Sequence, residues 1–237
     1  MPAEREPIFN APAVVGWTLA ALAAIHIVRQ FLTPAEDEHI LLLFAFLPVR
    51  YGLSPAEVPG GLAADVWTFV TYAGLHASFT HLIVNGVWLL AFGSPVAWRF
   101  GGTRFLLFAA ATAAAGAAAH LASHPGAAVP LVGASAGISG LTAAALRFVF
   151  HSGGPLGLLR RRGAAAFRQP AAPLMVALRT PQVVLFVAVW FGINLLYGVS
   201  AVGLGPVSAE IAWQAHLGGF VAGLLLFPLF DPVRRGA

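Results

Sequence analysis

The stretch VGASAGISGL (residues 132–141) places Ser135 among glycines near the start of a long apolar run. A packed apolar core has no need of that hydroxyl, and a membrane span is a costly place to keep polar groups. Whether the run is a soluble core helix or a membrane span decides the fold, and the composition of the chain answers this.

The composition predicts an integral membrane protein. Of 237 residues, 59% are hydrophobic and only 9% are charged, whereas soluble domains carry about 25% charged residues. All 13 basic residues are Arg, and helix orientation in a bilayer explains this excess better than a nucleic-acid partner does. The absence of Cys excludes disulfides, thiolate metal sites and a Cys nucleophile.

The apolar runs predict an all-α, six-transmembrane-helix bundle. A helix needs about 20 apolar residues to cross the hydrocarbon layer of a bilayer. We therefore expect one membrane domain over residues 1–237, without a separate soluble domain, and with six spans at residues 12–32, 68–93, 104–122, 131–150, 182–202 and 211–230.

The arginines predict the orientation of these spans. One side of the bundle would carry Arg5, Arg99, Arg104, Arg147, Arg160, Arg161, Arg162, Arg168, Arg179, Arg234 and Arg235, which leaves only Arg29 and Arg50 for the other side. By the positive-inside rule both termini are expected in the cytoplasm. The second, fourth and sixth spans then run parallel, each starting at the outer face.

Polar side chains gather in the outer halves of these three parallel spans. His76, His81 and Asn85 lie on the second span, where the last two are four residues apart and share a helix face. Ser135 is expected about 7 Å inside the fourth span, at 1.5 Å per residue. His216 lies near the start of the sixth span. The topology therefore predicts that these groups face one shallow cavity open to the outside.

These residue types suit nucleophilic catalysis. A Ser becomes a nucleophile when a His accepts its proton, and the resulting oxyanion needs preorganised donors. Ser135 and His216 could form the pair, while His81 and Asn85 offer donors from a neighbouring span. Every Asp and Glu lies in a loop, a terminus or the edge of a span, so we expect a Ser–His dyad without an acid.

Other readings remain open at this point. A span Ser can bond back to its own helix, and an intramembrane His can serve as a structural donor. Three His could ligate zinc, but an H-E-x-x-H arrangement is absent. A small transporter would often show inverted repeats, and none is evident. The spaced glycines of the fourth and sixth spans, among them Gly219 and Gly223, predict close helix packing in any of these cases.

Three motifs together resemble the rhomboid family of intramembrane serine proteases. HASFTHLIVN (76–85) is similar to H-x4-H-x3-N on the second span of that family. GAS (133–135) is similar to the start of the G-x-S-G nucleophile motif on the fourth, and AHLGGFVAG (215–223) to A-H-x-x-G-x-x-x-G on the sixth. Each motif alone is weak, but the three occur in order on the expected spans.

The resemblance implies roles for individual residues. Ser135 would be the nucleophile and His216 its general base. His81 and Asn85, with the backbone N–H of Ser135, would form the oxyanion hole. His76 would support that arrangement, as would Gly133, the first glycine of the nucleophile motif.

The resemblance also implies the substrate class. Rhomboids cut other membrane proteins within or beside a transmembrane helix, without a metal or organic cofactor, and the fifth span with the loop before the sixth would gate and cap the site. Partners would be transmembrane substrates and the lipid bilayer. A catalytically inactive relative that binds client helices is the alternative, but such relatives typically lose the Ser or the His. The Ala- and Arg-rich, Lys-free composition suggests a bacterial inner membrane.

Two positions depart from the family pattern. Ala136 follows the nucleophile where rhomboids usually have Gly, and its methyl group is a candidate source of crowding at the dyad. Ser139 stands where rhomboids often carry an aromatic residue that packs on the catalytic His. The lack of an aromatic ring at residue 139 predicts that His216 is held by other contacts.

Overall fold

The computed structural model describes residues 11–151, 153–156, 163–200 and 212–233, and within them the chain is helical without a β-strand. The α-helices are α1 (Ala13–Arg29), α2 (Pro34–Phe44), α3 (Gly61–Thr71), α4 (Phe79–Trp88), α5 (Ser94–Phe100), α6 (Gly102–Ser123), α7 (Ser135–Leu146), α8 (Leu174–Ala177), α9 (Pro181–Ser200) and α10 (Trp213–Phe230). Short helical turns are η1 (Pro48–Gly52), η2 (Pro55–Glu57), η3 (Tyr72–Gly74), η4 (Leu89–Gly93) and η5 (Gly163–Arg168).

Three of the described helices are long and apolar enough to cross a membrane. They are Phe79–Phe100, which joins α4, η4 and α5, then Gly102–Ser123 and Trp213–Phe230. Three shorter apolar helices cover Ala13–Arg29, Ser135–Leu146 and Pro181–Leu196. The prediction of an all-α membrane protein is therefore confirmed, with each helix close to one of the expected apolar runs.

The second expected span begins later than the apolar pattern predicts. The sequence predicts a helix over residues 68–93, but residues 75–78 are not helical and separate α3 from α4. The hydroxyl of Ser78 accepts a hydrogen bond from the backbone N–H of His81 at 3.1 Å, which is the bond of an N-cap. This cap starts the helix at Phe79, and His76 consequently precedes it.

The fourth expected span is also shorter than predicted. Leu131 is paired through both backbone groups with Phe46, at 2.8 and 3.1 Å, instead of being helical. Gly133 then takes a φ of +114°, and α7 starts at Ser135. Ser135 is thus the first residue of its helix, and the expected depth of 7 Å inside the helix is wrong.

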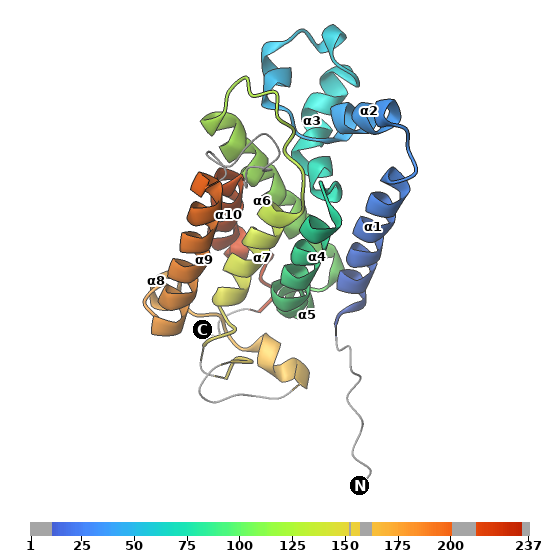
Figure 1. The fold of residues 1–237 in the computed structure, drawn as a ribbon. Helices are drawn as coiled ribbons and strands as arrows, with labels where there is room; N and C mark the ends of the chain where they lie inside the picture. The colour runs from blue at the N-terminus through green and yellow to red at the C-terminus, as the bar shows by residue number, and fades with distance from the viewer. Residues whose placement is uncertain (1–10, 152, 157–162, 201–211, 234–237) are drawn as a thin grey trace.

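Helix α7 lies in the middle of the bundle, with α4 on one side and α9 and α10 on the other (Figure 1). Residues 136–146 of α7 are all buried. A Cβ atom added at Gly219 of α10 would overlap the carbonyl oxygen of Ala136, and one at Gly223 would overlap that of Gly140. The predicted close approach of the fourth and sixth spans is therefore confirmed, and glycine makes it possible.

Short helices α2 and α3 cover one end of the bundle (Figure 1). Helix α2 starts with a capping box, in which the backbone N–H of Thr33 donates to the Glu36 carboxylate and the Thr33 hydroxyl oxygen accepts from the backbone N–H of Glu36. The backbone N–H and the hydroxyl of Thr33 both donate to the Glu36 carboxylate, and these two hydrogen bonds lower the pKa of that carboxyl. Arg50 is buried and donates to the carbonyl oxygens of Pro59 and Leu42, which ties the connecting segment to this end of the bundle.

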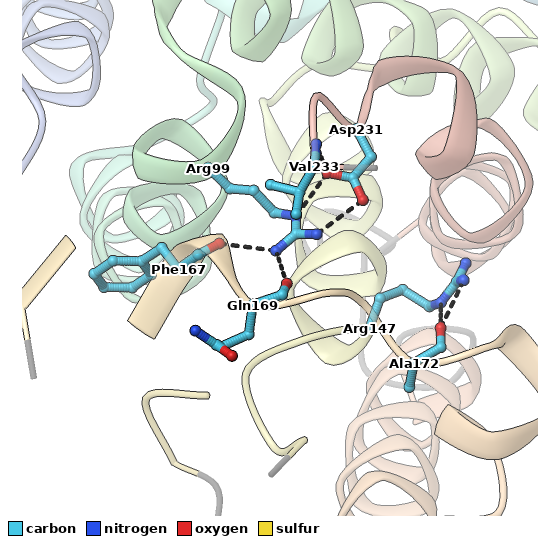
Figure 2. Close-up of polar contacts among 7 residues, drawn as sticks. All are labelled: Arg99, Arg147, Phe167, Gln169, Ala172, Asp231 and Val233. Atoms are coloured by element: carbon cyan, nitrogen blue, oxygen red, sulfur yellow. Dashed lines mark hydrogen bonds and ion pairs between the residues drawn. The ribbon is translucent and has the colours of Figure 1, made fainter. Parts of the chain in front are cut away.

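Two of the arginines assigned to the cytoplasmic side are buried at the other end. Arg99 makes a two-pronged ion pair with Asp231, with both N–O distances at 2.8 Å, and also donates to the carbonyl oxygens of Phe167 and Gln169 (Figure 2). Arg147 donates to the carbonyl oxygen of Ala172 (Figure 2). These arginines therefore hold together α5, α7, the segment after η5 and the end of α10.

Asp231→Ala is expected to destabilise the protein by roughly 3 kcal/mol, because it leaves the Arg99 guanidinium buried without its carboxylate. Thermal unfolding in detergent measures this. Arg104→Ala removes an exposed arginine nearby and serves as the control, expected to stay within about 0.5 kcal/mol of wild type. Equal melting temperatures for the Asp231 variant and wild type would contradict this account of Arg99.

Candidate active site

The N-terminal ends of three helices meet at the candidate site. Ser135 starts α7, His216 lies in the first turn of α10, and His81 lies in the first turn of α4. The first N–H groups of a helix have no partner within that helix, and its dipole favours negative charge there. The helices therefore present both side chains and backbone donors to one region.

The structure brings Ser135 and His216 together, although they are 81 residues apart. The Nε2 atom of His216 lies 2.7 Å from the Oγ atom of Ser135. This is hydrogen-bond distance, and it is the contact that a general base needs to take the proton of a nucleophilic hydroxyl. The close packing of α10 on α7 at Gly219 and Gly223 positions the two side chains.

The other ring nitrogen of His216 contacts a residue that the sequence reasoning missed. Its Nδ1 atom lies 2.5 Å from the Oδ1 atom of Asn194, on α9. The Nδ2 atom of Asn194 in turn donates to the carbonyl oxygen of Trp190 at 2.7 Å. The available signal was an amide side chain in the middle of the apolar run 182–202, the same kind of signal that drew attention to Asn85.

A cavity of about 1080 Å³ contains these groups. His81, Asn85, Ser135, Asn194 and His216 all line it, together with apolar side chains of α4, α7 and α9 and of the segment before α7, and with further polar side chains. The predicted clustering of polar groups from the second, fourth and sixth spans is therefore confirmed for His81, Asn85, Ser135 and His216.

A family model described as the Rhomboid domain matches residues 63–231, which is more than half of the chain. The chain belongs to the rhomboid family. The match begins within α3, so α1 and α2 lie outside it. No curated protein matches this chain.

Within this rhomboid, Asn85 is placed to present its amide to the cavity. Its Nδ2 atom donates to the carbonyl oxygen of His81, one turn earlier, at 2.9 Å. An amide nitrogen carries two hydrogens, and this bond uses one of them. Asn85 is buried, and its Oδ1 atom has no hydrogen-bond partner among the described residues.

His76 does not line the cavity with the other site residues. It lies in the non-helical segment before α4, is fully buried, and packs the edge of its ring against the ring of His81 at 5.1 Å between centroids. Its backbone carbonyl oxygen accepts a hydrogen bond from Arg29 at 2.9 Å. This placement fits a residue that holds His81 in position.

The methyl group of Ala136 does not crowd the contact between Ser135 and His216. A Cβ atom built on Gly116 of α6 would lie 2.5 Å from the Cβ atom of Ala136, so the methyl group faces α6, and Ala136 does not line the cavity. Ser139 donates back to the carbonyl oxygen of Ser135 at 2.7 Å. It supplies no aromatic ring, and His216 is instead held by Asn194.

Three or more His, Asp or Glu side chains do not converge into a metal site anywhere in the described part of the chain. The loop before the sixth span, expected from the resemblance to cap the site, falls within residues 201–211 and lies outside the described residues.

For the peptide-bond cleavage expected from the resemblance, Gly133→Ala is expected to lower kcat/KM about tenfold or more. A Cβ atom there would lie 2.6 Å from the ring atoms Cε1 and Nε2 of His81, and the φ of +114° is strained for any side chain. Gly126→Ala is the control, because Gly126 also has a positive φ but open space around it. If both variants cleave like wild type, Gly133 does not position His81.

Proposed function

We propose that this rhomboid is an intramembrane serine endopeptidase that cleaves transmembrane segments of other membrane proteins with a Ser135–His216 dyad. The observation that carries the proposal is the 2.7 Å contact between Ser135 Oγ and His216 Nε2 inside the cavity. The catalytically inactive relative that binds client helices is the alternative, and it gives no reason to keep both groups in contact.

The reaction would proceed through an acyl-enzyme. Ser135 Oγ attacks the carbonyl carbon of the scissile peptide bond while His216 Nε2 takes the hydroxyl proton. His216 then returns that proton to the leaving amine, and the C–N bond breaks. A water molecule, deprotonated by His216, attacks the ester carbonyl carbon. The ester C–O bond then breaks, His216 returns the proton to Ser135 Oγ, and the new carboxyl terminus is released.

The oxyanion of each tetrahedral intermediate needs donors that are fixed in advance. In the proposal these are the backbone N–H of Ser135, the second amide hydrogen of Asn85 and the imidazole of His81. His76 and Gly133 support them, His76 through ring contact with His81 and Gly133 through the space it leaves for that ring. These roles call for neither a metal nor an organic cofactor.

The membrane arrangement completes the proposal. The three long and three shorter apolar helices would supply six spans of one rhomboid domain over residues 1–237. The arginine distribution favours both termini in the cytoplasm, and the composition favours a bacterial inner membrane. A substrate helix would reach the cavity between α4 and α9, whose side chains Trp88 and Phe186 both line it.

Cleavage of single-span substrates by the purified protein in liposomes tests this function. Wild type is expected to release two fragments from at least one substrate whose span contains small and helix-breaking residues, while Ser135→Ala releases none. A wild-type protein that binds such substrates but cuts none of a broad panel would support the client-binding alternative.

A further inference from the structure

Asn194 makes a contact that neither the family match nor the dyad explains. It lies on α9, whereas Ser135 and His216 lie on α7 and α10. Its two amide atoms have different partners, the Trp190 carbonyl oxygen for Nδ2 and His216 Nδ1 for Oδ1. The side chain therefore bridges the backbone of its own helix and the candidate base.

This bridge fixes the proton on His216. The Trp190 carbonyl oxygen can only accept a hydrogen bond, so the amide must direct its nitrogen there and its oxygen towards the imidazole. An amide oxygen can also only accept, so His216 Nδ1 must carry a hydrogen. In the neutral imidazole the lone pair is then on Nε2, and that atom faces the Ser135 hydroxyl.

We infer that Asn194 is a positioning residue, which holds His216 in the Nδ1–H tautomer and with the ring orientation needed to deprotonate Ser135. The inference rests on the proposed function and extends the expected dyad to a Ser–His–Asn arrangement. An uncharged amide takes the place that an acid has in a Ser–His–Asp triad. Both ring nitrogens of His216 are then occupied, by Ser135 and Asn194.

The position of Asn194 on α9 has a consequence for the site. His216 belongs to α10, and among the described residues α9 also meets α10 where the ring of Trp190 stacks on the ring of Phe220 at 5.0 Å between centroids. The amide–imidazole bond is thus a polar contact between two separate helices, beside this ring contact. The orientation of the base therefore depends on where α9 lies.

Two substitutions of Asn194 by side chains of similar size distinguish a positioning role from a packing role. Asn194→Leu keeps the volume but removes the acceptor, and it is expected to lower kcat about 100-fold while KM changes less than threefold. Asn194→Asp keeps an acceptor and is expected to recover kcat to within about tenfold of wild type. Leu195→Ala, at an exposed position on the same helix, is the control and is expected to retain wild-type kcat.

The tautomer of His216 gives a readout that does not depend on cleavage. Nitrogen-15 NMR of histidine-labelled protein, with His216→Ala to assign the signal, is expected to show Nδ1–H in wild type and a shift towards Nε2–H in Asn194→Leu. An unchanged tautomer in Asn194→Leu, or a kcat equal to wild type, would overturn the inference. If wild type cuts no substrate, the proposed function fails, and the NMR comparison still decides the role of Asn194.

Discussion

His216→Ala is expected to reduce cleavage by at least 10³-fold, to the same residual level as Ser135→Ala. Ser135 Oγ has no other contact with a basic group than His216 Nε2 among the described hydrogen bonds, so the hydroxyl keeps its proton when the imidazole is removed. Because the two groups act as one unit, the double variant is expected to be no slower than either single variant. Initial cleavage rates in liposomes, at equal amounts of folded protein, measure this.

His39→Ala is the matched control for this prediction. His39 is an exposed histidine of α2, so its loss is expected to leave the rate within about twofold of wild type. Multiplicative losses in the double variant would show that Ser135 and His216 act independently, which contradicts a dyad.

Gly219→Leu is expected to prevent assembly of both the bundle and the site. Even a Cβ atom at residue 219 would overlap the carbonyl oxygen of Ala136, which is part of a buried helix backbone and cannot rotate away. Helix α10 would have to move off α7 and carry His216 away from Ser135. The melting temperature in detergent is expected to fall by more than 10 °C, and cleavage to be lost.

Gly192→Ala, on the apolar helix α9, is the control glycine variant. A Cβ atom at residue 192 on α9 would meet nothing within 4 Å among the described atoms, so we expect a melting temperature equal to or slightly above that of wild type. Wild-type stability for Gly219→Leu would contradict the close packing of α7 and α10.

The apolar runs and the three motifs predicted most of the helices and the clustering of Ser135 with His216. Both signals are strong, because a span needs a long apolar run and parallel spans bring their outer ends together. The exact helix starts depended on local signals that hydropathy does not register. The N-cap at Ser78 and the positive φ of Gly133 are two of these.

Two other features could not be predicted because they depend on contacts between distant segments. In the sequence, Arg99 and Arg147 indicate only the orientation of the spans, but the structure buries both, and Arg99 forms an ion pair with Asp231. The sequence places Asn194 within an apolar span, and nothing in the run 182–202 indicates which helix its side chain faces. Only the packing of α9 beside α10 brings its amide to His216.

Covalent labelling of Ser135 by a fluorophosphonate is the most direct test of the dyad, because it needs no knowledge of the substrate. Wild-type protein in liposomes is expected to gain the label, and mass spectrometry of the digested protein is expected to place it on Ser135. His216→Ala should remain unlabelled although folded. Unlabelled wild-type protein, or a label on another residue that persists in Ser135→Ala, would contradict the account of Ser135 as an activated nucleophile.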